Sequence, residues 1–149
     1  MTQNVLMPDS FVEFEPEFKD WQMSHYPNCS QKTVEFIEHL LERREGDELW
    51  QHQKEAILRI IFLYEVKIRA LESKYLLRIV TGGGKSLIIA SVIAWLKYAY
   101  RDQFDRFLII TPNLIVRDRL QDDFLRSPVD GKTIFERWSI FPDENLNKS

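Results

Sequence analysis

The segment Thr81-Gly82-Gly83-Gly84-Lys85-Ser86 decides how this chain is expected to fold. One apolar run, Tyr75 to Val80, precedes the segment, and a second, Leu87 to Leu96, follows it. This order predicts a strand, a glycine turn and a helix, which together form a phosphate-binding arrangement. The glycines let several backbone N–H groups approach a ligand closely, and the helix N-terminus adds partial positive charge.

Two side chains of this segment are expected to carry the binding chemistry. Lys85 would reach the β- and γ-phosphates of a nucleotide, and the Ser86 hydroxyl would help to hold Mg²⁺. The general P-loop pattern begins with a glycine, whereas this chain has Ile79 at that position. The alternative interpretation is a glycine-rich turn with an exposed lysine. The flanking apolar runs favour phosphate binding.

Length and composition limit the class of protein. The chain has 149 residues, enough for one domain with a core, and its net charge of −3 gives no overall basic character. Any contact with nucleic acid must therefore come from a local patch. Cys29 is the only cysteine, which excludes an internal disulfide, and the three histidines are interpreted as structural or surface residues.

The sequence also indicates where the protein acts. It contains no apolar run long enough to span a membrane and no N-terminal signal peptide pattern. We therefore expect a cytoplasmic protein with no membrane partner.

Before the glycine segment, the periodicity predicts an N-terminal arm and two helices. Residues 1–28 are acidic and aromatic and are broken by prolines, so we expect an extended arm packed on the domain, with a candidate short strand at Phe11 to Glu15. Ser30 can cap a helix from Gln31 to about Arg44. A second helix is expected from about Gln51 to Leu71.

After the glycine segment, the pattern predicts one βαβ unit. The strands are Tyr75 to Val80 and Phe107 to Ile110, the second buried on both faces, and the nearly all-apolar helix after Lys85 joins them. Asn113 can cap a further helix, and its inward-facing residues are expected to be Val116, Leu120 and Phe124. Thr133 to Phe141 is a weak candidate strand, and Asp143 to Ser149 is expected to be a polar tail.

Three segments together resemble the first three motifs of a superfamily 2 helicase or translocase, with a DEAD/DEAH-like ATP-binding domain. They are Leu49 to Ala56, the glycine segment, and Leu108 to Asn113. A non-glycine start before Thr-Gly-x-Gly-Lys-Ser is the form that this superfamily carries. The run from Phe107 to Leu120 is most similar to type III restriction enzyme Res subunits. The resemblance covers about Leu49 to Phe124.

This resemblance implies roles for further residues. Gln53 would read the adenine edge, since a carboxamide both donates and accepts hydrogen bonds. Thr111, Pro112, Asn113 and Arg117 would contact the nucleic-acid backbone. Each role has an alternative. Gln53 is then a polar residue on an exposed helix face, Thr111 and Asn113 form only a turn and a cap, and the arginine is paired with a neighbouring aspartate.

An acidic box at the end of an apolar strand is also expected in a working ATPase of this kind. Asp143-Glu144 is rejected as this box because it follows Pro142 near the C-terminus without a convincing strand before it. A second RecA-like domain is absent from the sequence. This chain alone is therefore expected to be inactive, with ATP hydrolysis near background, whereas the full-length parent would be a hydrolase.

The prediction is an α/β, P-loop, RecA-like parallel sheet with helices on both faces, incomplete in this chain. Residues 1–30 would form an acidic N-terminal arm, and residues 31–149 the N-terminal part of helicase ATP-binding domain 1. The resemblance implies the ATP-binding portion of a DNA-dependent ATPase/translocase of a type III restriction-modification system. It also implies ATP and Mg²⁺ as cofactors, DNA as partner, and a modification methyltransferase subunit as a candidate second partner.

Two alternatives stay open for the function. The first is a fragment of a type I restriction motor or of another superfamily 2 helicase. The second, of a different class, is a truncated, non-enzymatic fragment that binds nucleotide or serves only as a partner module.

Overall fold

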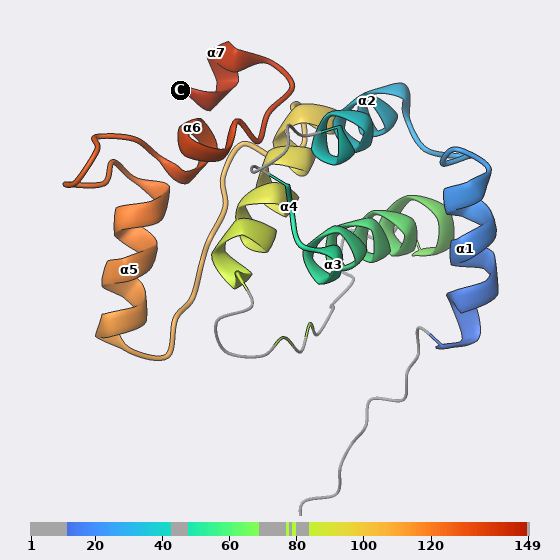
Figure 1. Ribbon diagram of the computed structural model, residues 1–149, viewed down its shortest axis with the longest axis horizontal. Helices are drawn as coiled ribbons and strands as arrows, with labels where there is room; N and C mark the ends of the chain where they lie inside the picture. The colour runs from blue at the N-terminus through green and yellow to red at the C-terminus, as the bar shows by residue number, and fades with distance from the viewer. Residues whose placement is uncertain (1–11, 43–47, 69–76, 78, 80–83, 149) are drawn as a thin grey trace, which may run out of the picture.

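The computed structural model describes residues 12–42, 48–68, 77, 79 and 84–148, and this part of the chain is helical without a strand. Figure 1 shows the arrangement. The elements are η1 (Val12–Phe14), α1 (Glu15–Met23), α2 (Gln31–Leu41), α3 (Gln51–Phe62), η2 (Leu63–Ile68), α4 (Lys85–Ala99), α5 (Leu114–Phe124), α6 (Ile134–Trp138) and α7 (Glu144–Asn147). Here η1 is a 3-10 helix, and η2 is a π-helix that continues α3.

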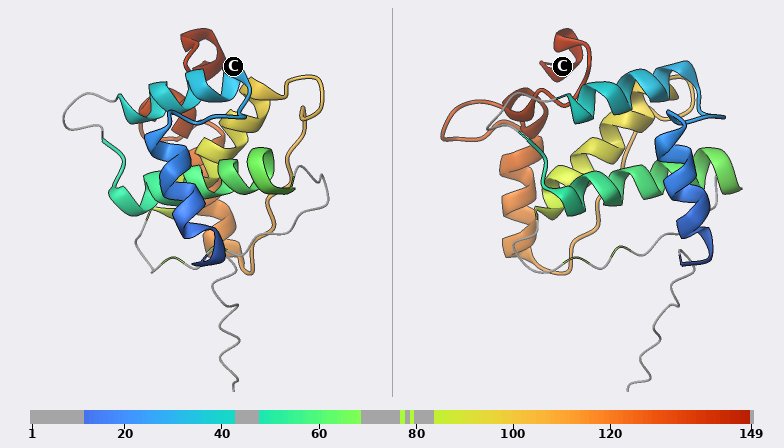
Figure 2. Two further views of the ribbon diagram at one scale, coloured as in Figure 1. Left: turned by 90° about the vertical axis from the view of Figure 1, so that its right-hand side faces the viewer. Right: turned by 45° about the vertical axis from the view of Figure 1, so that its right-hand side comes forward.

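Helix α4 lies at the centre of the core, where α2 and α3 both pack against it (Figure 2). The side chains that meet there come from all three helices and are almost fully buried. The main ones are Phe36, Ile37, Leu40, Ile57, Ile61, Ile88, Ala94 and Trp95. Burial of each such large side chain contributes roughly 1.5–3 kcal/mol. This packing sets the positions of both ends of α4.

The helix predicted after Lys85 is confirmed, and its apolar surface is used on two sides. One side forms the core. The other side lines an apolar groove of about 280 Å³. Leu77 and the segment from Phe107 to Ile109 complete the walls of this groove.

The expectation of a doubly buried strand at Phe107 to Ile110 is wrong for the described residues. This segment belongs to no helix or strand, and Leu108 and Ile110 are each 85% exposed. Phe107 and Ile109 are half-buried, so the inward face alternates along the chain. A strand requires a hydrogen-bonded neighbour. The expected neighbour, Tyr75 to Val80, lies outside the described residues except for Leu77 and Ile79, and the sheet therefore stays a prediction.

The N-terminal residues from Val12 onward are helical, and the expectation of an extended arm is wrong for them. Phe14, Phe18 and Trp21 recur at helical spacing, and a proline in the first turn is compatible with a helix. Phe18 and Trp21 are buried, with ring centroids 5.6 and 5.3 Å from that of Phe62. Helix α1 therefore packs across the end of α3, as Figures 1 and 2 show. The candidate strand residue Phe11 lies outside the described residues.

The two expectations for the C-terminal residues are also wrong. Helix α6 stands where the strand was expected. In its first turn, the backbone N–H of Glu136 donates to Thr133 Oγ1 at 3.3 Å. The sequence Thr-x-x-Glu is a capping-box signal, which predicts this helix start. The expected polar tail contains α7, and Asn147 is buried there. Its side chain bonds the backbone N–H and carbonyl of Phe141 at 2.8 and 3.0 Å.

The remaining helix predictions are confirmed with shorter bounds. Helix α2 begins after the Ser30 cap and ends at Leu41, whereas residues 43–47 lie outside the described part. Helix α3 is followed by a π-helix to Ile68, and residues 69–71 are not described. Helix α5 forms as expected, but it has no buried residue, and Val116 is 38% exposed. Leu120 and Phe124 are only half-buried.

The first prediction tests the packing of α1. Trp21→Ala removes a nearly fully buried ring and should lower the free energy of unfolding by about 3–5 kcal/mol. Met23→Ala, on the same helix but 78% exposed, is the matched control and should change it by less than about 0.5 kcal/mol. Urea unfolding followed by circular dichroism measures both. Equal midpoints for the two variants would show that α1 does not stabilise the domain.

Candidate nucleotide-binding site

Gly84 sets the start of α4. Its backbone is left-handed, with φ 73° and ψ 40°, and its carbonyl accepts the N–H groups of Leu87 and Ile88 at 3.2 and 3.4 Å. Glycine adopts this conformation without the cost that a Cβ atom imposes. Helix α4 therefore begins at the position that the sequence predicted.

Gln53 connects α3 to this helix start. It is 4% exposed, so the alternative that places it on an exposed helix face is wrong. Its Oε1 accepts the Trp50 N–H at 2.9 Å, and its Nε2 donates to the Gly84 carbonyl at 3.3 Å. Two residues that the sequence assigned to adenine and to phosphate therefore lie in direct contact.

A side chain at Gly84 would displace the Gln53 carboxamide. A Cβ atom there would lie 2.1 Å from Gln53 Nε2, well inside van der Waals distance. The left-handed backbone therefore favours glycine at this position, and a Cβ atom would in addition displace the Gln53 carboxamide from its hydrogen bonds. In the sequence motif, this glycine is explained only by the close approach of the backbone to a ligand. The contact with Gln53 adds a reason that lies within the protein itself.

The two side chains expected to bind phosphate and metal occupy the first turn of α4. Lys85 is exposed and Ser86 is half-buried. Both lie where the partial positive charge of a 15-residue helix is concentrated. Thr81, Gly82 and Gly83 lie outside the described residues, so their part in the site stays a prediction.

The described residues contain no group of three or more His, Cys, Asp or Glu side chains that could hold a metal ion. A Mg²⁺ ion at Ser86 would therefore take most of its ligands from phosphate oxygens and water, as Mg²⁺ in nucleotide sites commonly does. The hydroxyl fits that role as one oxygen ligand. It does not by itself constitute a metal site.

The segment assigned to nucleic acid forms a turn and a helix cap. Asn113 Oδ1 accepts the Val116 N–H at 3.0 Å, and the Thr111 hydroxyl donates to the Asn113 carbonyl at 3.4 Å. Pro112 is exposed. Arg117 bonds Asp118 through Nε and Nη2 at 3.0 and 2.9 Å. These contacts agree with the structural alternative and leave the nucleic-acid role a prediction.

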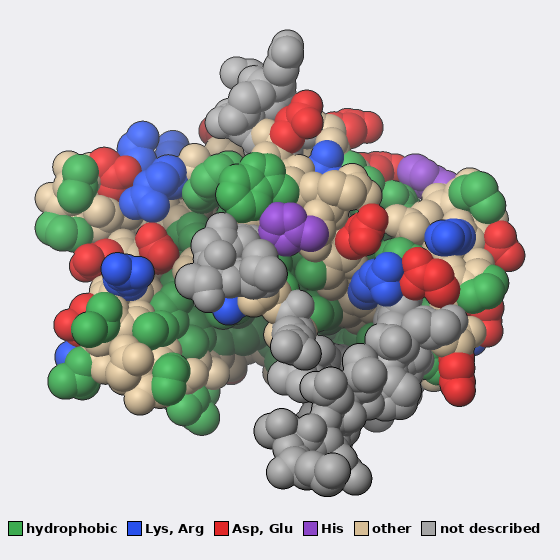
Figure 3. All heavy atoms as spheres, turned by 60° about the horizontal axis from the view of Figure 1, so that its bottom comes forward, with side chains coloured by type: hydrophobic (Ala, Val, Ile, Leu, Met, Phe, Trp, Pro, Cys, Tyr) green, Lys and Arg blue, Asp and Glu red, His purple; other side chains and the backbone are tan. Residues whose placement is uncertain are grey.

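Charge is mixed on the surface seen in Figure 3, where basic and acidic side chains alternate without forming a broad basic area. Several described arginines are paired with carboxylates, as in the contact of Arg137 with Asp130 at 3.1 Å. This guanidinium donates a hydrogen bond that lowers the pKa of Asp130 below its usual value. Pairing of this kind limits the positive charge available to a nucleic-acid backbone.

The Asp-Glu pairs provide no acidic box in the described residues. Asp143 caps α7 by accepting the Asn145 N–H at 2.9 Å, which agrees with its rejection from the sequence. Asp47-Glu48 is a second pair in the chain, and it precedes the glycine segment instead of following it. Glu48 is exposed, and Asp47 lies outside the described residues. His25 and His52 are exposed and His39 is half-buried, and the rings of His25 and His39 bond Glu38 and the Ser139 carbonyl.

A glycine-led helix with a lysine and a hydroxyl in its first turn, bonded to a glutamine from the preceding helix, points to the class of P-loop nucleotide-binding proteins. A comparison with protein families supports this class. Residues 47–144 match the family described as type III restriction enzyme, res subunit. The chain belongs to this family, which confirms the resemblance noted in the sequence.

Membership has consequences at the family level. It implies a P-loop NTPase fold and a helicase/ATPase-like domain of a restriction system, and such domains generally use ATP with Mg²⁺. The matched stretch begins before α3 and leaves α1 and α2 outside. Searches of the curated proteins and of the solved structures found no match to the chain. Within the described residues, the helices are too short or too polar to cross a membrane.

The second prediction tests the contact between Gly84 and Gln53. Gly84→Ala should lower the free energy of unfolding by about 2–4 kcal/mol, because left-handed strain and a steric clash act together. Gly131→Ala is the matched control, since Gly131 has a similar φ of 67° with no atom within 4 Å of the added Cβ. It should cost only about 1–2 kcal/mol.

A double variant separates the clash from the strain. Adding Gln53→Ala to Gly84→Ala removes the clashing carboxamide. The double variant should therefore lose less free energy of unfolding than the sum of the losses in the two single variants. Thermal unfolding of the four proteins measures this coupling. Strict additivity of Gly84→Ala and Gln53→Ala, together with equal losses of stability for Gly84→Ala and Gly131→Ala, would contradict the contact.

Proposed function

We propose that this chain is the ATP-binding portion of a DNA-dependent ATPase/translocase of a type III restriction-modification system. The observation that carries the proposal is the hydrogen bond from Gln53 Nε2 to the Gly84 carbonyl. It joins the residue proposed for adenine to the residue that begins the phosphate-binding helix. Family membership over residues 47–144 supports the restriction context.

Gln53 retains the groups that adenine recognition requires. A carboxamide has two N–H donors and two acceptor lone pairs. The Gly84 carbonyl takes one N–H, and the Trp50 N–H takes one lone pair. One donor and one acceptor are then left for an adenine edge, while the two existing bonds hold the carboxamide in place. Recognition of the base would thus be coupled to the position of the glycine turn.

Lys85 and Ser86 would act on the phosphates. The exposed Lys85 ammonium would neutralise charge on the β- and γ-phosphates, and Ser86 would donate one oxygen to Mg²⁺. The bound ion would supply further charge neutralisation between the phosphates. The first-turn N–H groups of α4 would face the same ligand, and burial of the opposite side of the helix would keep them oriented.

The proposed parallel sheet would lie on the apolar groove of α4. Leu77, from the segment before the glycines, and Phe107 and Ile109, from the segment after α4, line that groove together. A sheet on this groove would cover Ile89 and Val92 and bury the apolar face of α4. This placement supports the finer fold prediction.

The DNA-facing role is proposed for Thr111, Pro112, Asn113 and Arg117. All four precede or begin α5, whose side chains in the described structure are not buried. Arg117 is about half exposed despite its bond to Asp118, so a phosphate can compete for its guanidinium. A modification methyltransferase subunit and a cytoplasmic location belong to the same proposal.

The third prediction concerns ATP–Mg²⁺. The chain should bind it weakly, and Lys85→Ala should reduce binding below detection because the ammonium aimed at the phosphates is lost. Lys97→Ala is the matched control, since Lys97 lies in the last turn of the same helix. Isothermal titration calorimetry at low salt measures both. Equal titration curves for the two variants would end the phosphate assignment.

The fourth prediction distinguishes an enzyme from a nucleotide-binding module. Phosphoryl transfer needs a positioned water, a well-held metal ion and charge stabilisation, and the described residues supply only part of the metal site. The chain alone should therefore release phosphate at a rate near background. A coupled phosphate-release assay measures the rate. Turnover that persists through stringent purification and is lost in Lys85→Ala would favour an intact active site.

A further inference from the structure

Trp50 is a large aromatic residue that stays on the surface beside the candidate nucleotide site. It is the residue before α3, and it is 58% exposed. The other three tryptophans all take part in packing, because Trp21 and Trp95 are buried in the core and Trp138 is half-buried. Burial of an indole stabilises a fold strongly, so an indole left in water retains a large apolar face for a ligand.

The backbone of Trp50 is bonded to the residue that is proposed to read the base. Its N–H donates to Gln53 Oε1 at 2.9 Å, and its carbonyl accepts the N–H groups of Gln53 and Lys54 at 2.9 and 3.1 Å. The same carboxamide donates to the Gly84 carbonyl at 3.3 Å. One side chain therefore joins Trp50 to the start of α4, and Trp50 lies at the end of the site proposed for the base.

Gln53 by itself provides a base with no surface for stacking. It is 4% exposed, and two of its hydrogen-bonding positions are already occupied, so it presents only an edge to a ligand. The flat faces of an adenine ring stay in water unless another group covers them. An exposed indole next to this carboxamide provides such a cover, and stacking of this kind accepts every base because every base has a π-face.

A neighbouring ring restricts the Trp50 side chain without burying it. The centroids of the Trp50 and His52 rings are 5.5 Å apart, and the two planes are tilted by 45°. Contact with a second ring reduces the rotamers that the indole samples, whereas most of its surface remains exposed. A side chain that is already restricted loses less conformational entropy when a ligand binds.

We propose that Trp50 is the base-stacking residue of the candidate nucleotide site and that its indole packs on one face of the adenine ring. This inference rests on the proposed function, since it adds a contact to the same nucleotide. It divides recognition of the base between two neighbouring residues. Trp50 holds a base by its face, and Gln53 selects adenine at its edge.

A ligand without a base separates this contact from phosphate binding. Inorganic tripolyphosphate carries the phosphates of ATP but no base, and isothermal titration calorimetry with Mg²⁺ compares the two ligands. Trp50→Ala should weaken ATP binding by about tenfold and leave tripolyphosphate binding unchanged. Lys85→Ala should weaken the binding of both, because the lost ammonium acts on the phosphates.

Further variants at the same position test whether an aromatic face is required. Trp50→Phe should retain most of the ATP affinity, whereas Trp50→Leu, which keeps apolar surface without a π-face, should lose about as much as Trp50→Ala. All three leave the backbone N–H that bonds Gln53 in place, and the exposed position tolerates substitution. Stacking should also quench the fluorescence of Trp50, so ATP should quench the unchanged chain more than Trp50→Phe.

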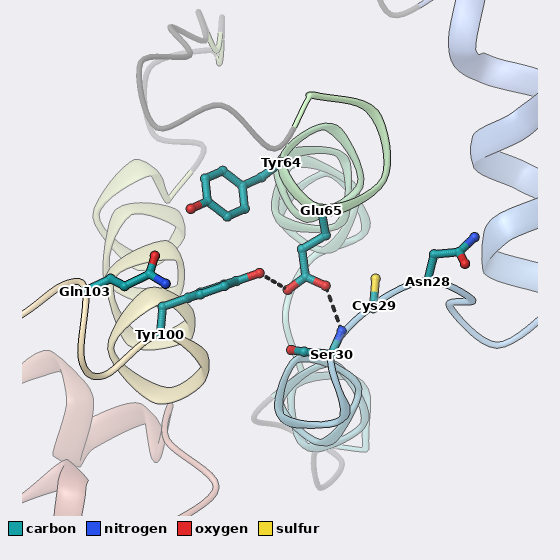
Figure 4. Close-up of a pocket in the computed structure, with 7 residues that line it drawn as sticks. All are labelled: Asn28, Cys29, Ser30, Tyr64, Glu65, Tyr100 and Gln103. Atoms are coloured by element: carbon teal, nitrogen blue, oxygen red, sulfur yellow. Dashed lines mark hydrogen bonds between the residues drawn. The ribbon is translucent and has the colours of Figure 1, made fainter.

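Gln103→Ala is the matched surface control. Gln103 is exposed and lines a separate pocket of about 570 Å³ beyond the last turn of α4, where Glu65 accepts the Tyr100 O–H at 2.6 Å (Figure 4). Because this pocket lies at the opposite end of α4 from Gly84, Gln103→Ala should leave the binding of ATP and tripolyphosphate unchanged.

The possible failures of these experiments can be told apart. Full ATP affinity in both Trp50→Ala and Trp50→Leu would overturn the stacking role and leave nucleotide binding intact. Equal weakening of ATP and tripolyphosphate binding by Trp50→Ala would also overturn it, because the loss would not involve the base. No ATP binding by the unchanged chain would refute the proposed function, and the stacking role with it.

Discussion

The position of helix α4 is the constraint on which the rest of the structure depends. Its inner side packs on α2 and α3 through side chains with almost no exposure, including Ile88, Ala94 and Trp95. The candidate nucleotide site and the pocket beside Glu65 lie at opposite ends of this helix. Gly84 begins it next to Gln53, and Tyr100 follows its last turn next to Glu65. A shift of α4 against α3 would therefore alter the site and the pocket together.

Polar contacts support this packing at each end by different means. At the start of α4, one neutral carboxamide bonds two backbone groups, and each such bond contributes about 0.5–1.5 kcal/mol. At its end, a buried carboxylate accepts three donors from α2, its cap and the residue after α4. Removal of one partner there leaves a buried charge or donor unsatisfied, which costs more than the net contribution of the bond.

The structure describes one part of the predicted site, whereas the other part lies outside the described residues. Gly84, Lys85, Ser86 and Gln53 are placed, and family membership over residues 47–144 agrees with the motif that suggested them. The roles of these residues toward ATP, and those of Thr111 to Arg117 toward DNA, stay proposals. The pocket beside Glu65 has no motif in the sequence, because its lining comes from three separate segments.

Local sequence patterns determined the elements whose signals act over a few residues. Ser30, Asn113 and the glycine before Lys85 each predicted a helix start that the structure contains, because caps satisfy N–H groups within one turn. The motif order also identified the family. The strand predictions are wrong at Thr133, where a capping-box signal starts a helix, and at Phe107 to Ile110, where apolar content alone does not produce a strand.

Only the tertiary structure decided which distant residues meet. The contact of Gln53 with Gly84 and the bonds of Glu65 to Ser30 and Tyr100 join positions separated by about thirty residues or more in the chain. No periodicity encodes such pairs, since they follow from how α2, α3 and α4 pack. The sequence by itself therefore determined the class of protein and the motif that begins α4. The packing of the helices decided which side chains stand beside that motif and where a second pocket forms.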